Sequence, residues 1–352
     1  MAGTTFKCPN CGAYLTFDPE TQLWKCPFCS SGFSEAELLQ KDDEYQKEAQ
    51  TQEPETVPTA DGAQVVYRCP SCGSEIVTDE TTVATQCYYC HSPVVLQGKL
   101  TNDMRPDKVL PFSIDKDKAI QTFLAWAKTK KYIPNAFFQE AQLQTMSGVY
   151  YPHFVTECQV DGSVEGQASN SHVMDSGKYI VTTTEHYHVR RDGRFTFRNI
   201  MRPALSKANR KLSDGIHPFP LEKAKPFSGA YLSGFLAERR DIDADSIREN
   251  VEKEVAEYVT PMLRDTLSYE STQVNSSSKV RGMKTQYVLL PTWVLTYPNK
   301  SNPEEPYYYA LNGCTGEVCG KLPIDKRKLR RKAFLVGAIV FVLMCLAGYF
   351  LY

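Results

Sequence analysis

The amino-acid sequence lacks several features that would assign it to a common class of protein. Its N-terminus, MAGTTFKCPN, has no apolar stretch, which excludes a secretory signal peptide. No segment has the pattern G-x-x-x-x-G-K followed by Ser or Thr, so a phosphate-binding P-loop is absent. No Ser-His-Asp order, nucleophile elbow or paired-carboxylate motif stands out. We therefore expect a protein that is not an enzyme.

The chain also carries almost no net charge, with 40 basic against 41 acidic residues, yet its charges are strongly segregated. Residues 34–61 hold nine carboxylates and two lysines, whereas residues 321–332 hold seven basic residues and one aspartate. The placement of charge is therefore more informative than its sum.

Cysteine, in contrast, is abundant, and eight of the twelve cysteines form Cys-x-x-Cys pairs. The pairs make two units of the form C-x2-C-x14-C-x2-C, CPNCGAYLTFDPETQLWKCPFC from residue 8 and CPSCGSEIVTDETTVATQCYYC from residue 69. A shift of 61 residues superimposes all four cysteines of the first unit on those of the second. A proline, a glycine and an aspartate recur as well, which indicates an internal duplication.

Four thiolates on two such turns can close a tetrahedron around a metal ion and leave no position for water. The expected ligands are Cys8, Cys11, Cys26 and Cys29 in the first unit and Cys69, Cys72, Cys87 and Cys90 in the second. Each unit has few apolar residues, so metal binding should supply much of its folding free energy. We expect two structural Zn²⁺ ions in a reducing compartment, with iron as the alternative because four sulfurs also suit iron.

Cys87-Tyr88-Tyr89-Cys90-His91 also matches the attachment motif of c-type haem. Haem is attached outside the cytoplasm, and the duplication already matches these two cysteines to a pair of the first unit. The metal unit is therefore the favoured interpretation. His91 could replace a thiolate as ligand, although a surface position after the turn is favoured.

The cysteine and charge patterns divide the chain into six segments. They are a first zinc ribbon (1–33), an acidic linker (34–64), a second zinc ribbon (65–98), an α+β domain (99–323), a basic juxtamembrane segment (324–332) and a transmembrane helix (333–352). In the linker, Ser34 and Glu37 form a capping-box pattern that predicts a short helix, and Pro54 and Pro58 should end any regular structure. The expected fold class is α+β, with two small β ribbons, a larger α+β domain and one C-terminal transmembrane helix.

The α+β domain shows two helical patterns. In residues 113–134, one face of the predicted helix carries Ile120, Phe123, Leu124 and Ala127. A second helical period runs through residues 247–259, and Pro261 should kink or end that helix.

Strand patterns surround these helices. Residues 179–200 are β-branched and aromatic, and Asp192-Gly193 within them predicts a hairpin turn. Residues 286–298 and 307–318 predict a further pair, the latter turning through Asn312-Gly313.

Residues 333–352 contain no charge, and a helix of this length spans roughly 30 Å, the thickness of a bilayer's hydrocarbon core. The basic residues before it, 326–332, should stay on the cytoplasmic side. The sequence therefore predicts a tail-anchored, single-pass protein of the cell membrane with cytoplasmic N-terminal domains.

Five further stretches carry a resemblance to a known family. They are VLPF at 109–112, GVYYPHF at 148–154, PFSGAYLSGF at 226–235, LLPTWVLTY at 289–297 and YYYALNGCTGEVCGKLP at 307–323. Together with the cysteine units, they make the chain resemble bacterial tail-anchored zinc-ribbon membrane proteins, whose ribbons are of the transcription factor IIB or rubredoxin type. Some of these proteins are labelled helicase-like, a label that the missing P-loop does not support. The resemblance implies a membrane-attached adaptor found with SPFH-domain and PspA-like envelope-stress proteins.

Other constellations are weaker. His186 and His188 share a strand face without an identifiable third ligand, so an exposed polar face is favoured. The lone cysteines Cys158, Cys314 and Cys319 are more typical of small buried side chains, and Cys345 lies in the predicted span. Cys314 and Cys319 lie at and just after a predicted turn and could pair oxidatively.

Residues 190–202 combine arginines with aromatics. Arg194 and Arg198 lie on one strand face, and Phe195 and Phe197 lie on the other. The aromatic face favours core packing. The arginine face favours solvent, with contact to lipid, protein or nucleic acid as alternatives.

These patterns lead to one main functional expectation. We expect a membrane-anchored, zinc-dependent adaptor or scaffold that recruits soluble protein partners, in envelope stress or membrane maintenance. The alternative is a membrane-tethered nucleic-acid-binding zinc-ribbon protein, whose binding must weaken steeply with salt. A metalloenzyme would need an open metal position, and the sequence indicates no small-molecule substrate.

Overall fold

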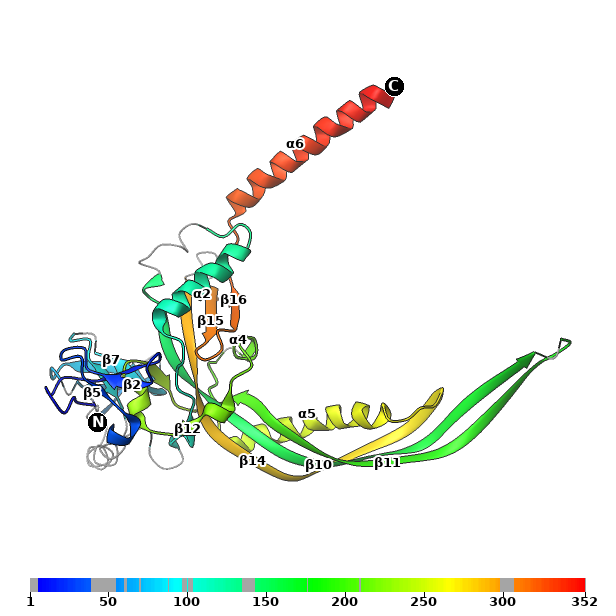
Figure 1. Cartoon of the computed structure of the whole chain (residues 1–352), viewed down its shortest axis with the longest axis horizontal. Coiled ribbons are helices and arrows are strands. Elements are labelled where there is room, and N and C mark those ends of the chain that lie inside the picture. Colours follow the sequence, from blue (N-terminus) through cyan, green and yellow to red (C-terminus); the bar gives the residue numbers. More distant parts are fainter. Residues whose placement is uncertain are drawn as a thin grey trace.

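The computed structural model describes residues 6–38, 55–59, 62–69, 71–87, 89–96, 100, 104–134, 143–175, 177–208, 210–297 and 307–351 of the 352-residue chain, with backbone only at 55–59, 62–66, 68 and 348–351. These residues form an α+β fold that consists mostly of sheet (Figure 1). Its strands belong to three sheets.

The first two sheets are small. One contains β1 (Thr16–Asp18), β2 (Leu23–Lys25) and β3 (Gly32–Phe33), and the other contains β4 (Glu55–Thr59), β5 (Gly62–Arg68) and β6 (Glu75–Asp79).

The third, which we call the main sheet, has ten strands around β10 and β14. It contains β7 (Thr82–Gln86), β8 (Pro93–Val95), β9 (Lys108–Val109), β10 (Ser147–Asp175), β11 (Ile180–Pro203), β12 (Lys225–Pro226), β13 (Leu236–Glu238), β14 (Ser271–Tyr297), β15 (Tyr307–Asn312) and β16 (Val318–Lys321). The described helical elements include α2 (Lys116–Thr129), α4 (Arg210–Asp214), η4 (Leu221–Lys223), η5 (Gly229–Leu232), α5 (Ala244–Arg264) and α6 (Lys326–Leu351).

Three strands of the main sheet continue far beyond it as a long arm (Figure 1). We define the arm as residues 157–175, 177–199 and 271–284, in which β10 pairs antiparallel with both β11 and β14. Irregularities in register occur at its base, between Thr156 and Cys158 and between Gln159 and Val160. Such bulges bend a strand, and they lie where the arm leaves the sheet.

The predicted turn at Asp192-Gly193 is wrong, because β11 runs straight through both residues. Gly193 lies directly opposite Gly162 of β10, and α5 packs over this pair. A Cβ on Gly162 would lie 2.2 Å from Val259 Cγ1, and one on Gly193 would lie 3.1 Å from Leu263 Cδ2. Gly193 therefore allows helix α5 to approach the strand closely. The chain reverses instead between Asp175 and Ile180.

Both predicted helices are present. In α2, Phe123 and Ala127 are buried, and Ile120 and Leu124 pack beside them, as the helical period predicts. In α5, the buried face consists of Val251, Val255, Val259 and Leu263. The helix continues past Pro261 to Arg264, so this proline does not end it.

The core of the main sheet is aromatic, and it gathers residues from four of the stretches that carry the family resemblance. Phe112 stacks on Phe235 with ring centroids 4.3 Å apart. Tyr150 and Trp293 lie 5.0 and 5.1 Å from Phe112. The predicted pair of strands is also present as β14 and β15, and the chain turns after Asn312 into β16.

The linker differs in part from its prediction. The capping box forms, because the backbone N–H and the hydroxyl of Ser34 both donate to the Glu37 carboxylate, at 2.7 and 2.8 Å. Pro54 lies outside the described residues. Pro58, however, does not end regular structure, since it lies in β4 and pairs with Ala63. A proline is tolerated there because β4 is an edge strand.

The predicted transmembrane helix, and with it the predicted localisation in the cell membrane, is contradicted. Within the described part of the chain, no helix combines the length and the apolar character needed to cross a bilayer. Helix α6 begins at Lys326, so its first turns carry the basic residues of the predicted juxtamembrane segment.

Candidate metal centres

The four Cys-x-x-Cys pairs adopt the same backbone turn. In each, the residue after the second cysteine donates its amide to the carbonyl of the first cysteine, at 2.9 to 3.0 Å. That residue has a positive φ in every case: Gly12 (74°), Ser30 (58°), Gly73 (75°) and His91 (58°). Glycine suits this left-handed position at two of the turns. At the other two, a residue with a side chain adopts the less favourable left-handed conformation.

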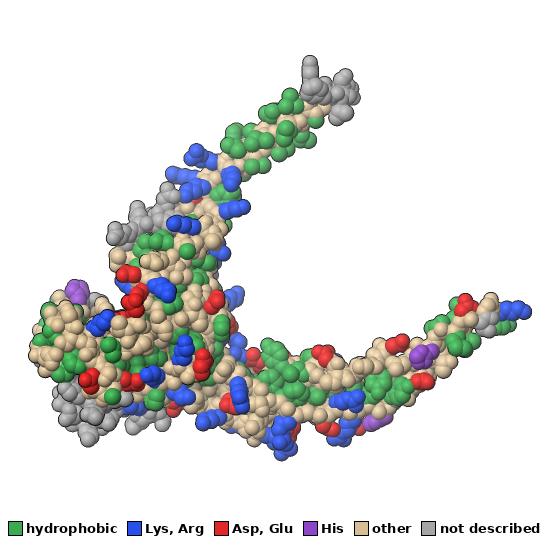
Figure 2. Space-filling view, in the orientation of Figure 1, with side chains coloured by type: hydrophobic (Ala, Val, Ile, Leu, Met, Phe, Trp, Pro, Cys, Tyr) green, Lys and Arg blue, Asp and Glu red, His purple; other side chains and the backbone are tan. Residues whose placement is uncertain are grey.

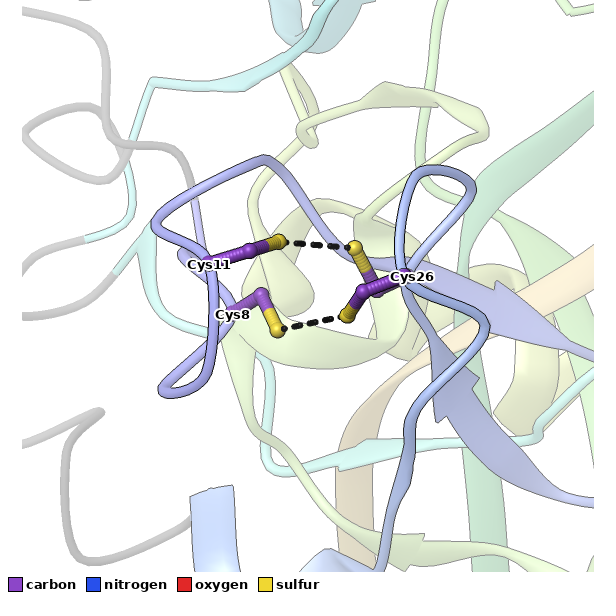
Figure 3. Close-up of side chains that lie close together, drawn as sticks. Cys8, Cys11 and Cys26 are labelled. Atoms are coloured by element: carbon purple, nitrogen blue, oxygen red, sulfur yellow. Dashed lines mark hydrogen bonds between the residues drawn. The ribbon is translucent and has the colours of Figure 1, made fainter.

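The first unit brings its four sulfurs together (Figure 3). Cys8 Sγ lies 3.5 Å from Cys29 Sγ, and Cys11 Sγ lies 3.5 Å from Cys26 Sγ. All four atoms are within 4.8 Å of one another. Sulfurs at about 2.3 Å from a tetrahedral metal would be about 3.8 Å apart, so this cluster fits a four-thiolate metal site.

The second unit repeats the arrangement. Cys69 Sγ and Cys90 Sγ are 3.7 Å apart, as are Cys72 Sγ and Cys87 Sγ, and all four lie within 4.8 Å. In both units the first cysteine of each pair is buried, which places the site between the turn and the small core beneath it. The structure therefore holds two four-cysteine clusters at metal-binding geometry.

Serine residues support the sulfurs. Three of the four turns have Ser two positions after the second cysteine: Ser31, Ser74 and Ser92. The hydroxyl and amide of Ser31 lower the pKa of Cys29 to about 6, and those of Ser74 lower the pKa of Cys72 to about 6. The spacing Cys-x-Ser was a sequence signal for these supporting residues that the sequence analysis missed.

His91 is not part of the second cluster. Its backbone supplies the left-handed residue of the turn, and the ligand position next to it is held by Cys90. The side chain of His91 is exposed, as the sequence analysis favoured.

The first unit is anchored to the main sheet through the segment 226–235. The indole N–H of Trp24 donates to the carbonyl of Ala230 at 2.7 Å, and Tyr231 packs against Phe17 with ring centroids 5.3 Å apart. The amide of Phe17 donates to the carbonyl of Ser233 at 3.0 Å. Tyr231 and the backbone carbonyls of this stretch thus form a docking surface for the first unit.

The second unit joins the main sheet directly. Its strand β7 pairs with β13, so that Ala84 lies opposite Ala237. Next to this pair, Arg239 donates its amide to the carbonyl of Thr81 at 2.8 Å and forms an ion pair with Glu80 at 2.8 Å. Residues 226–239 therefore hold both units, a role that the sequence did not indicate.

The remaining cysteines form no disulfide. Cys158 is buried beneath α5, as expected. Cys314 Sγ contacts the carbonyl of Pro111 at 3.2 Å, and Cys319 lies against Gly215, so these two do not pair with each other. Cys345 is exposed on α6.

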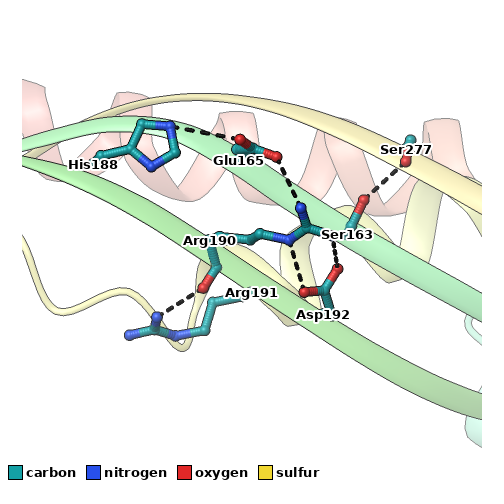
Figure 4. A network of polar contacts seen from close by, with 7 residues as sticks. All are labelled: Ser163, Glu165, His188, Arg190, Arg191, Asp192 and Ser277. Carbon is teal, nitrogen blue, oxygen red and sulfur yellow. Dashed lines mark hydrogen bonds and ion pairs between the residues drawn. The ribbon is translucent and has the colours of Figure 1, made fainter.

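The histidine and arginine faces of the arm are exposed and ion-paired (Figure 4). His188 Nε2 and Arg190 both lie 3.5 Å from the Glu165 carboxylate, and no metal-binding group of three ligands includes His186 or His188 among the described residues. Further along β11, Arg194 pairs with Asp161 at 3.0 Å and Arg198 pairs with Glu157 at 3.1 Å.

Phe195 and Phe197 pack on the other face against the cluster beneath α5. The favoured interpretation, an aromatic core face with a solvated arginine face, thus agrees with the structure.

Comparison with known proteins gives one relative. Over 327 residues, 92% of each chain, the sequence is 29% identical to a protein of Bacillus subtilis (strain 168) named "Uncharacterized protein YdjG". No family model matches the chain, and no solved structure matches it. Because the match covers nearly the whole of both chains, the similarity concerns the complete architecture rather than the cysteine units alone.

Proposed function

We propose that both four-cysteine clusters bind Zn²⁺ and that the metal is structural. Four thiolates fill every position of a tetrahedral ion, so no site remains for water or substrate. Iron would use the same four sulfurs, and elemental analysis separates the two. The purified full-length chain should contain two zinc ions, one for each cluster, and should show no visible absorption.

We further propose that the protein is a non-enzymatic adaptor, whose metal units brace a rigid frame from which the arm reaches a protein partner. The observation that carries this proposal is the tip of the arm. It exposes five apolar side chains: Val173, Met174, Tyr179, Ile180 and Val181. Figure 2 shows them as an apolar patch near the end of the arm.

This exposure has no role in the fold of the described residues. Tyr179 and Ile180 are each 74% exposed, and Met174 is 70% exposed. Apolar side chains that gather at the end of an extended element are typical of a site that another molecule covers. The arm supports such contact mechanically, because β10 is hydrogen-bonded to a strand on each side over most of its length.

The charges on the arm favour a protein partner over nucleic acid. Arg194 and Arg281 both pair with Asp161, and Arg190 pairs with Asp192 at 2.9 Å. Arginines held by carboxylates offer less positive charge to a phosphate backbone. The tip, moreover, combines its apolar residues with a single lysine, Lys178, and Asp175 beside it.

Photo-crosslinking tests the adaptor proposal. A photoreactive amino acid placed at Tyr179 of the full-length chain should capture a specific protein in cells, and the SPFH-domain and PspA-like proteins that the family resemblance implies are the first candidates. Ile180→Glu should weaken recovery of that protein at least about tenfold, because a carboxylate would have to be buried at the contact.

Thr183→Glu is the matched control, because it adds the same charge to an exposed position on the same strand. It should leave recovery unchanged. Equal recovery with Ile180→Glu would contradict the tip as the contact. Salt-sensitive recovery of nucleic acid without a protein would contradict the adaptor and support the nucleic-acid alternative.

A further inference from the structure

A cavity of about 730 Å³ lies away from both cysteine clusters, between the main sheet and the segment that contains α4. On the sheet side, His153 of β10 and Thr292, Val294 and Thr296 of β14 face it. The three β14 residues alternate along the strand and so share one face. The volume is within the range of about 300 to 1,000 Å³ that is usual for small-molecule sites.

Two buried polar residues of the lining, His153 and Ser213, are neutral and satisfied. His153 is buried, its Nε2 lies 2.7 Å from Ser213 Oγ, and its Nδ1 lies 3.2 Å from the carbonyl of Tyr151. A carbonyl can only accept, so Nδ1 carries the proton and the Ser213 hydroxyl donates to Nε2. Burial lowers the pKa of His153 to about 4, which keeps the ring uncharged near neutral pH. His153 and Ser213 therefore do not provide a charge for an ion.

The charges of the cavity come instead from three lysines and one glutamate: Lys207, Lys211, Lys321 and Glu238. Lys207 is held by Glu238 at 3.1 Å and by Asp79 at 3.4 Å. Lys211 forms no ion pair with any residue that the structure describes, and its side chain is exposed. The lining thus carries an excess of positive charge.

Part of the lining is aliphatic. Leu205 and Ile216 are buried, and Ala208 and Leu212 are partly buried. All four come from the segment over the sheet. An occupant would thus meet hydrocarbon from this segment and ammonium groups elsewhere in the lining.

We propose that this cavity binds an aliphatic carboxylate of the fatty-acid type, with the alkyl chain between the aliphatic side chains and the carboxylate near Lys211. Burial of each CH₂ group is favourable, so the alkyl chain supplies most of the affinity and the lysine sets the preference for an anion. The site shares no residue with the metal clusters or with the tip of the arm.

The test uses full-length protein and a dansyl-labelled undecanoic acid. Its fluorescence should rise saturably with one site per chain, and decanoate should displace it far better than decanol, which lacks the charge. Lys211→Glu should raise the dissociation constant about tenfold, because an attractive charge at the carboxylate becomes a repulsive one. Lys118→Glu makes the same change on the exposed face of α2 and should have no effect.

Ala208→Trp provides an independent test, because an indole at this partly buried position would occupy the cavity. It should abolish probe binding while circular dichroism and the melting temperature show that the chain is folded. The proposal is overturned if the parent shows no saturable binding, if decanol competes as well as decanoate, or if the folded Ala208→Trp protein binds the probe like the parent.

Discussion

The indole N–H of Trp24 donates to the carbonyl of Ala230, a residue 206 positions further along the chain, at 2.7 Å. Both residues are buried, and the Trp24 ring also packs on Tyr231 with centroids 5.0 Å apart. Since Trp24 lies in β2, two residues before Cys26, this contact couples the first cysteine cluster to the main sheet. The stability of the two should therefore be linked.

Trp24→Phe should destabilise the protein by roughly 1–3 kcal/mol, because the buried carbonyl of Ala230 would lose its donor while an aromatic ring remains. Urea unfolding of the full-length chain measures the change. The matched control is Trp126→Phe, since the indole of the partly buried Trp126 has no recorded acceptor among the described residues. A control variant as unstable as Trp24→Phe would contradict the importance of the hydrogen bond.

Loss of one cluster's metal ion should leave the other ion bound, but it should lower protection beyond the cysteine unit itself. Cys8→Ser should reduce the zinc content from two ions to one and remove hydrogen-exchange protection from β1 and β2, because the small core of the unit depends on its metal. Protection should also fall in residues 229–233, which contact that unit. Cys319→Ser, outside both clusters, should keep both ions. Retention of two ions by Cys8→Ser would show that Cys8 is not a ligand.

The cysteine clusters could be predicted because the information is local. The two residues between the cysteines of each pair set the spacing of its turn. The repeat at 61 residues indicates which pairs form one unit. The same holds for α2, whose apolar period and cap at Asp115 are within one segment. The support from Ser31 and Ser74 was also local, yet it needed the shape of the turn to be recognised.

The arm could not be predicted because its causes are distant in sequence. A Gly in a β-rich segment is compatible with a turn or with a close neighbour, and Leu263, about 70 residues away from Gly193, decides between them. The anchoring of both cysteine units on residues 226–239 likewise depends on contacts across more than 150 positions. For residues 333–352, the uncharged composition alone suggested a span, whereas the described helix starts within the basic residues.

Gly162 offers a direct test of how the arm is held. Gly162→Ala should destabilise the protein by roughly 1–3 kcal/mol, because its Cβ would lie 2.2 Å from Val259 Cγ1 and α5 would have to move. Gly282→Ala, also in the arm, has no atom within 4 Å of the new Cβ and should be neutral or slightly stabilising. Thermal unfolding with tryptic cleavage in α5 as a second readout would compare the two. Equal stability of both variants would contradict tight packing of α5 on β10.

The buried His153 predicts a pH dependence of stability. Its pKa is about 4 in the folded protein because burial disfavours the charged ring, whereas an unfolded histidine has a pKa of about 6.5. The unfolded state therefore binds more protons between these values, and stability must fall as the pH drops through 6.5 toward 4. From pH 7 to pH 5.5, this one residue should remove about 1 kcal/mol from the free energy of unfolding.

The variant His153→Gln isolates that effect, because it cannot titrate in this range. Its free energy of unfolding should be offset from the parent by the lost contact with Ser213, and the offset should shrink by about 1 kcal/mol between pH 7 and pH 5.5. Asp214 and the partly buried His217 act on the same ring, so the difference between parent and variant is the quantity to measure rather than either slope alone. The exposed His186→Gln should show no such change. A constant offset for His153→Gln would mean that the ring is already accessible to protons in the folded state.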